Sequence, residues 1–110
     1  MKYDVWLTRS AENDLNEAAD YIEFVLMNAQ AADDLMNAAE ETFTALAEFA
    51  ARHPLLNDPV FRAWGIQFVQ IRHYIAFYTI DEANQRVYIV RFLYKKRNWI
   101  GILKNDFTLE

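Results

Sequence analysis

The first half of the chain changes from strand-like to helix-like hydrophobic spacing. The segment YDVWLT, residues 3–8, alternates apolar and polar positions and predicts a first strand. Apolar residues then recur three or four positions apart, which predicts one helix from about Ala11 to Met27, with Ser10 as its N-cap. A second helix is predicted from about Asn28 to Pro54. The core face of the first helix consists of Ala11, Leu15, Ala18, Ile22 and Val25.

The second half returns to strand-like patterns. The segment HPLLNDPVFRAWG, residues 53–65, holds both prolines and predicts a loop with at most one helical turn. Three strands are predicted at 66–71, 74–80 and 86–94. Arg72-His73 and residues 81–85 are the expected connections between these strands, and Trp99 to Leu103 is expected to form a short turn or helix that packs back.

This order, β-α-α-β-β-β, predicts a single α+β domain over residues 1–110. A helical hairpin is expected to pack on one face of a mainly antiparallel four-stranded sheet. Residues 74–80 and 86–94 are apolar on both sides if they alternate strictly. Because a hairpin covers only one face, the other face is expected to need a further covering element, with a bound partner as one candidate.

Charge and composition narrow the class of protein. The chain has 110 residues, no cysteine and a net charge of −5. Residues 1–50 carry two basic and eleven acidic residues, a balance of −9, and residues 51–110 carry nine and five, a balance of +4. No run of 18 apolar residues and no secretory signal are visible, so we expect a cytoplasmic protein without membrane contact.

Little in the sequence points to catalysis. His53 and His73 without cysteine do not give metal-ligand spacing, and the two glycines do not form a phosphate-binding loop. No catalytic residue, metal or cofactor is therefore assigned. Arg91 lies mid-strand among apolar residues, and because burying an unpaired guanidinium is costly, it is expected either to pair with an acid or to face a partner.

Four short motifs in this order resemble the RelE/ParE superfamily of bacterial toxins. They are A-x-x-D-L at Ala11 to Leu15, Y-x-x-F-Y at Tyr74 to Tyr78, V-Y-I-V-R at Val87 to Arg91, and the basic-Trp ending Arg97-Asn98-Trp99. The resemblance implies the toxin of a type II toxin–antitoxin module, of the kind that inhibits growth and stabilises plasmids. It also implies a cognate antitoxin that wraps the toxin with an extended segment and a helix.

The resemblance leaves two molecular targets. RelE-like members cut messenger RNA in the ribosomal A site, and ParE-like members inhibit DNA gyrase. Ile75 stands where the nucleases place a phosphate-binding arginine, and no Lys or Arg lies between Gln30 and Phe49. We therefore interpret the chain as ParE-like more than RelE-like, an inhibitor that acts by binding. A ribosome-dependent, metal-independent mRNA endonuclease remains one alternative, and a degenerate member that only binds its antitoxin and regulates their shared promoter is another.

The partners are accordingly the cognate antitoxin and either gyrase or the ribosome, with DNA contacted only through the antitoxin. The residues expected to contact target or antitoxin are Arg72, His73, Ile75, Phe77, Arg91, Lys95, Lys96, Arg97 and Trp99. Cations at a strand end also blunt an edge against aggregation, which is the simpler role for the Lys95–Arg97 cluster.

Overall fold

A computed structural model describes residues 2–108. Its elements, in chain order, are β1 Asp4–Leu7, α1 Arg9–Asp20, the π-helical turn η1 Tyr21–Val25, α2 Ala29–Phe49, the 3-10 turn η2 Ala50–Arg52, α3 Pro59–Ala63, β2 Gln67–Ile71, β3 Tyr74–Asp81, β4 Arg86–Tyr94 and α4 Trp99–Thr108. Among these described residues, no helix is both long and apolar enough to cross a membrane.

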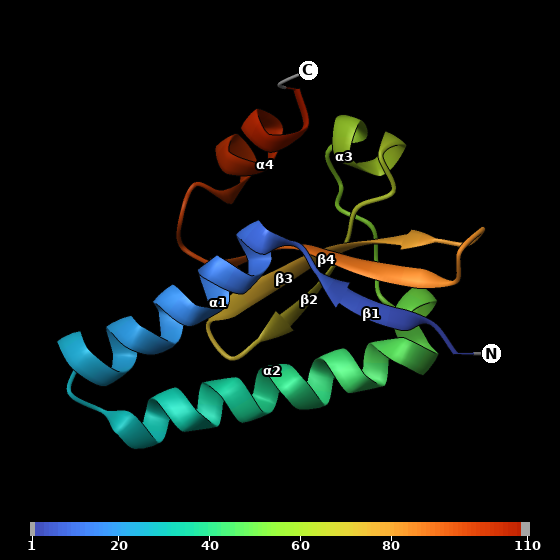
Figure 1. The fold of residues 1–110 in the computed structure, drawn as a ribbon. Coiled ribbons are helices and arrows are strands. Elements are labelled where there is room, and N and C mark those ends of the chain that lie inside the picture. The colour runs from blue at the N-terminus through green and yellow to red at the C-terminus, as the bar shows by residue number, and fades with distance from the viewer. Residues whose placement is uncertain (1, 109–110) are drawn as a thin grey trace.

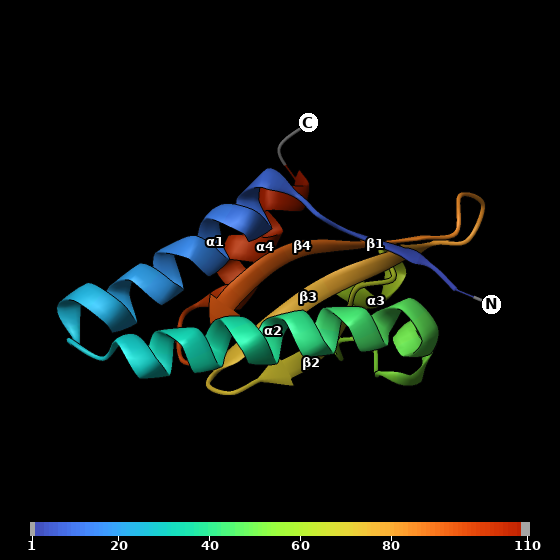
Figure 2. The ribbon, with the colours of Figure 1, turned by 60° about the horizontal axis from the view of Figure 1, so that its bottom comes forward.

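The four strands form one sheet in the order β1-β4-β3-β2. Strand β1 runs parallel to β4, and the β4–β3 and β3–β2 pairs are antiparallel. The α1–α2 hairpin covers one face of the sheet, while α3 and α4 lie on the other (Figure 1; Figure 2). The predicted α+β class, the element order and the mainly antiparallel sheet are confirmed.

The hairpin begins two residues earlier than predicted, because Thr8 and not Ser10 is the N-cap of α1. The Thr8 hydroxyl accepts a hydrogen bond from the Ala11 amide at 3.1 Å and donates one to the Val90 carbonyl at 3.0 Å. Thr8 directly follows β1, and its two hydrogen bonds connect the start of α1 to β4. Asn28 caps α2 as predicted, by accepting from the Ala31 amide at 3.0 Å.

Helix α1 does not continue in α geometry to Met27. After Asp20 it widens into η1, which shifts the following side chains around the axis relative to α spacing. The predicted core residue Val25 is consequently 63% exposed, whereas Ala11, Leu15 and Ala18 are buried as expected. Assigning Val25 to the core face was therefore wrong.

Two polar side chains of the sheet, Tyr78 and Gln67, close the core on the hairpin side by hydrogen bonding to backbone carbonyls that follow α2. The Tyr78 hydroxyl donates to the Ala50 carbonyl at 2.5 Å, and Gln67 Nε2 donates to the Ala50 and His53 carbonyls at 3.1 and 2.7 Å. Burial raises the pKa of Tyr78, which keeps its hydroxyl a donor. These bonds satisfy carbonyls that the end of a helix leaves without an intrahelical partner.

The second face of the sheet is covered by the chain itself. Phe61 of α3 and Leu103 of α4 are fully buried against Phe77 and Leu93 of the sheet. Helix α4 runs to Thr108, longer than the short segment predicted from Trp99 to Leu103. The expectation that a bound partner would be needed to cover this face is therefore not supported, whereas the predicted helical turn in the 53–65 loop is confirmed as α3.

Strand β4 does not alternate strictly. The pairing with β3 shifts register between Phe77 and Tyr78, so that β4 carries one extra residue at this point. Phe92 thus joins Val87 and Ile89 in the cluster beneath the hairpin, and Val90 packs with Leu93 on the opposite face. Strict alternation would place Leu93 with Val87 and Ile89 and Phe92 with Val90, and this prediction was wrong because sequence alternation alone does not reveal a bulge.

Candidate functional site

Five of the predicted site residues meet at one end of the sheet. Arg72 and His73 form the turn between β2 and β3, and Lys95, Lys96 and Arg97 directly follow β4. The Lys95 amide donates a hydrogen bond to the His73 carbonyl at 2.9 Å, which holds the turn beside the cations. All five side chains are exposed, and none forms an ion pair with another described side chain. We call these five residues the basic end.

Arg72 occupies an unusual backbone position in this group. Its φ of 57° lies in the left-handed region, which residues with a Cβ rarely adopt. A two-residue strand connection commonly needs such a conformation and usually takes it with glycine or asparagine. Gln70 Nε2 donates to the Arg72 carbonyl at 2.9 Å and helps to hold the turn.

An open cleft of about 810 Å³ adjoins the basic end. On the sheet side it is lined by Tyr74, Phe92 and Tyr94. The Tyr74 and Phe92 rings stack with centroids 5.1 Å apart, and the Tyr94 ring meets Tyr74 edge-on at 5.5 Å. We call this the aromatic cleft. Phe92 itself is 2% exposed, so the partly exposed rings of Tyr74 and Tyr94 supply the flat surface on which an apolar side chain or another ring can pack.

The rim of the aromatic cleft carries both signs of charge. Glu17 of α1 lines it on the hairpin side, and His73 and Arg97 line it on the sheet side. Burial raises the pKa of Tyr74, with smaller contributions from Tyr94 and Tyr21, so the Tyr74 hydroxyl remains protonated at neutral pH. The cleft therefore suits a ligand that carries acidic and basic groups around an apolar centre.

Arg91 is held inside the molecule. Its Nε and Nη2 atoms donate to both carboxylate oxygens of Asp14 at 2.6 and 2.9 Å, and Nη1 reaches Asp106 of α4 at 3.0 Å. These hydrogen bonds, that to Asp14 first, raise the pKa of Arg91 against the opposing effect of burial. Of the two expectations for Arg91, pairing with an acid is the one found, and the acids belong to its own chain.

Three further predicted site residues lie on the opposite face of the sheet. Phe77 is fully buried, and the Trp99 ring packs against it with centroids 5.3 Å apart. Ile75 packs partly buried in the same cluster. The structure thus separates Ile75, Phe77 and Trp99 from the basic end, and Phe77 has no surface with which to contact a partner in this conformation.

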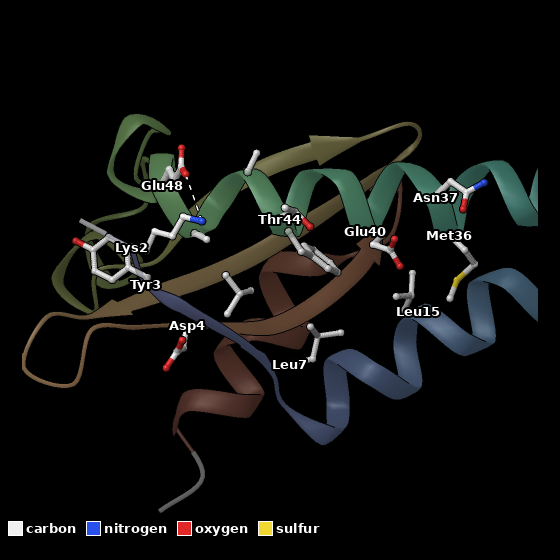
Figure 3. Close-up of a pocket in the computed structure, with 14 residues that line it drawn as sticks. Lys2, Tyr3, Asp4, Leu7, Leu15, Met36, Asn37, Glu40, Thr44 and Glu48 are labelled. Atoms are coloured by element: carbon white, nitrogen blue, oxygen red, sulfur yellow. Dashed lines mark ion pairs between the residues drawn. The ribbon is translucent and has the colours of Figure 1, made fainter.

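A second hollow of about 680 Å³ lies between β1 and α2. Leu7, Leu15 and Met36 line it, and the Lys2–Glu48 ion pair, at 3.6 Å, stands at one end (Figure 3). Strand β1 is an edge strand, so its outer backbone groups are not used by the sheet. We call this hollow the edge groove.

Sequence reasoning missed Asp14 as a structural residue, and it did not place Tyr21 and Phe92 with Tyr74 and Tyr94 in one surface. Asp14 accepts a hydrogen bond from the Phe92 amide at 3.1 Å as well as those from Arg91. Asp14 belongs to the A-x-x-D-L motif, but nothing in that motif indicates that Arg91 is its partner. Among the described residues, no three His, Asp or Glu side chains group closely enough to hold a metal ion.

Residues 5–99 match the family model of the ParE toxin of the type II toxin–antitoxin system parDE. The chain belongs to the ParE toxin family. The ParE family lies within the RelE/ParE superfamily, and the predicted ParE-like assignment is confirmed.

Two solved structures resemble this ParE-family toxin. A chain of the chromosomal ParDE system from P. aeruginosa superimposes with a TM-score of 0.67 at 18% identity, over 84% of this chain and 96% of that one. A chain of the RelBE2 toxin–antitoxin complex from Mycobacterium tuberculosis gives 0.59 at 21% identity, over 86% and 99%. Curated protein sequences give no significant match.

Proposed function

We propose that this ParE-family toxin inhibits DNA gyrase by binding, and that a cognate antitoxin neutralises it in the cytoplasm. The supporting observation is the state of Arg91. Its guanidinium is bound to Asp14 and Asp106, and no other arginine lies near the middle of the sheet in the described chain. A binding inhibitor does not require a reactive group at this place.

A ribonuclease without metal needs cations that stabilise the charge developing on phosphate and a group that transfers protons. Arg91 is neutralised by two carboxylates, and Ile75 packs in an apolar cluster where the nucleases are expected to hold phosphate. The net charge of −5 also disfavours entry into the phosphate-rich ribosomal A site. All three observations favour inhibition by binding over RNA cleavage.

The basic end is the proposed contact with the target. Its five exposed side chains carry four permanent cations and one histidine, with no carboxylate partner among the described side chains. Such a group binds acidic protein surfaces in a salt-dependent manner. Gyrase itself is the target that membership in the ParE family implies.

The antitoxin is proposed to occupy the two hollows. The edge groove fits an extended segment, because the outer side of β1 can accept main-chain hydrogen bonds. The aromatic cleft fits apolar side chains of a helix, and acidic residues beside that helix would meet His73 and Arg97. Both structural relatives come from toxin–antitoxin systems, which supports such a partner.

One observation favours ribosome-dependent mRNA cleavage as a second candidate. The basic end lies directly beside stacked aromatic rings, and cations next to rings can hold an RNA backbone while bases stack. This arrangement supplies binding to RNA but no assigned proton-transfer group.

The two candidates are separated by parallel assays on purified toxin. We expect inhibition of DNA supercoiling by gyrase, reversed by the protein that the adjacent gene encodes, and no cleavage of messenger RNA on programmed ribosomes. Codon-phased cuts with unaffected gyrase would replace the proposal with the nuclease function. Inactivity in both assays, with tight binding of the neighbouring gene product, would favour a member that only regulates its promoter.

A further inference from the structure

One corner of the sheet is left open by α3 and α4. It lies where β1 and β4 begin, at the opposite end of β4 from the basic end (Figure 1). Trp6 of β1 is 51% exposed, and it lies opposite Tyr88 of β4, which is partly exposed. Both side chains point away from the hairpin, because their neighbours Val5 and Val87 pack in the core beneath it. We call Trp6, Arg86 and Tyr88 the sheet corner.

The three side chains of the sheet corner hold one another in place. The Arg86 guanidinium lies over the Trp6 ring, 4.9 Å from its centroid, and Nη1 of Arg86 donates to the Tyr88 hydroxyl at 3.2 Å. Trp, Tyr and Arg are the residue types that contribute most to binding at protein interfaces. Because these contacts already fix the side chains, a partner that packs on them pays little side-chain conformational entropy.

The rim of the sheet corner carries an excess of negative charge. Asp4 and Asp81 lie opposite Arg86 on the two neighbouring strands, and Glu82 follows in the turn between β3 and β4. The balance of these four charges is 1 − 3 = −2. Lys2, close by in the sequence, forms its ion pair with a carboxylate of α2 at 3.6 Å instead. Exposed rings bordered by carboxylates complement a surface that presents several cations.

The basic end supplies that complementary surface on the same chain. Its four permanent cations form no ion pair with another described side chain. The basic end follows the last residue of β4, whereas the sheet corner includes its first. Two copies aligned head to tail along β4 can therefore join the two surfaces. Two sheet corners, or two basic ends, would instead bring like charges together.

We propose that the sheet corner binds the basic end of a second copy of the toxin in a head-to-tail contact. The same pairing can repeat, because each copy keeps one free surface of either kind. The sheet corner lines neither hollow, so the proposed target and antitoxin contacts leave it unused. The contact does not depend on gyrase as the target, but it covers the residues proposed to meet that target. Self-association thus holds free toxin in a masked form.

Sedimentation equilibrium of the purified toxin tests for this self-association. We expect the average mass to rise over an about hundredfold range of concentration, because small interfaces are weak, and to fall toward the monomer as salt rises. Trp6→Ser with Asp4→Asn alters the sheet corner, and the change of Lys95, Lys96 and Arg97 to alanine removes cations of the basic end. In each variant alone, self-association should weaken by about tenfold or more.

Mixing the two variants identifies which surfaces meet. The sheet-corner variant keeps an intact basic end, and the basic-end variant keeps an intact sheet corner. An equimolar mixture should therefore form pairs, with nothing larger, because each pair lacks a second intact contact. A contact between two identical surfaces would not restore association in this way.

The end of α2 offers a matched control variant. Phe49 is 43% exposed, and the Arg52 guanidinium lies over its ring, 4.3 Å from the centroid. Glu48 is an exposed acid beside it. Phe49→Ser with Glu48→Gln therefore makes the same kind of change away from the sheet corner and should change self-association by less than about twofold. Circular dichroism and thermal unfolding verify that every variant folds.

Four results would overturn the proposal. The first is a wild-type toxin that stays monomeric across the range, and loss of gyrase inhibition in its sheet-corner variant would then assign that surface to the target. The second is self-association of the basic-end variant alone, which would mean that two sheet corners pair with each other. The third is a mixture of the two folded variants that forms no pairs. The fourth is self-association that salt does not weaken. Because the measurement contains only the toxin, inactivity toward gyrase leaves its outcome unchanged.

Discussion

At the scale of single residues, Asp14 connects the first helix to the last strand and the last helix. It receives Arg91 through two hydrogen bonds and the Phe92 amide through a third, while Arg91 also reaches Asp106. Two motifs that resemble the toxin superfamily, A-x-x-D-L and V-Y-I-V-R, thus contribute the two halves of one ion pair. In this chain, both motif residues therefore have a structural role.

Removing Asp14 should therefore destabilise the fold. In Asp14→Ala, the mostly buried Arg91 loses its bidentate partner and the Phe92 amide loses its acceptor, at a cost of about 2–3 kcal/mol in the free energy of unfolding. Asp106→Ala is the matched control, since Asp106 is more exposed and its loss should cost less than about 1 kcal/mol. Urea unfolding measures both, and equal costs would contradict the assigned importance of Asp14.

The ionisation of Tyr78 should lower the free energy of unfolding at alkaline pH. Its folded pKa is raised by burial, so above the unfolded value of about 10 only the unfolded state loses the proton, and stability falls as pH rises. Tyr78→Phe should cost about 1 kcal/mol at pH 7, through the lost bond to the Ala50 carbonyl.

The difference between wild type and Tyr78→Phe should then shrink by about 1 kcal/mol between pH 9 and pH 11. Urea unfolding at several pH values measures this difference, and the other tyrosines titrate alike in both proteins. A constant difference across this range would show that Tyr78 ionises equally in both states.

At the scale of elements, α4 and α3 decide which surfaces remain for a partner. Because Leu103 and Phe61 cover Phe77 and Leu93, this part of the second face of the sheet is core and not a binding face. The hairpin shows the opposite outcome, since its π-helical turn exposes Val25, which helical spacing had assigned to the core. The available surfaces are thus the basic end, the two hollows, the sheet corner and the exposed connection between α1 and α2.

The docking of α4 can be tested within that helix. Leu103→Ala should lower the free energy of unfolding by about 2–5 kcal/mol, because it leaves a cavity against the sheet. Ile100→Ala changes a side chain that is 44% exposed on the same helix and should cost less than about 1 kcal/mol. Chemical denaturation compares the two variants, and similar costs would mean that α4 does not pack as described.

At the scale of the whole molecule, the two charged halves of the sequence meet in space. The acidic hairpin and the basic end both line the aromatic cleft, where Glu17 lies on one side and Arg97 on the other. Figure 1 shows why: α1 lies alongside β4, whose last residue leads into the cation cluster. A partner entering this cleft therefore meets both signs of charge.

Replacing Lys95, Lys96 and Arg97 together by alanine should abolish toxicity in growing cells while the protein still folds. Each substitution is on the surface and should change stability by no more than about 0.5 kcal/mol. The control triple variant of Lys2, Arg9 and Arg62 to alanine makes the same change in net charge, from −5 to −5 − 3 = −8, away from the cleft. Growth assays compare them, and full toxicity in the first variant would reduce the cluster to a solvated strand end.

The sequence alone determined the α+β class, the element order and the family. It also placed Arg72 and His73 in a strand connection, and Lys95 to Arg97 at the end of a strand. The class, the element order and the turns follow from hydrophobic spacing, from capping residues such as Asn28, and from short connections, all of which act over a few neighbouring positions. The family was indicated separately, by the resemblance of four short motifs.

Only the tertiary structure decided which elements cover the second face of the sheet, which acids pair with Arg91, and that Val25 is exposed. A π-helical turn and a β-bulge each shift the spacing by one residue, and no local pattern records that shift. Arg91 pairs with Asp14, 77 residues away in the sequence. Phe77 is covered by α4, which follows β4 in the sequence. Such contacts are fixed by the packing of whole elements against one another, so the chain must fold before they exist.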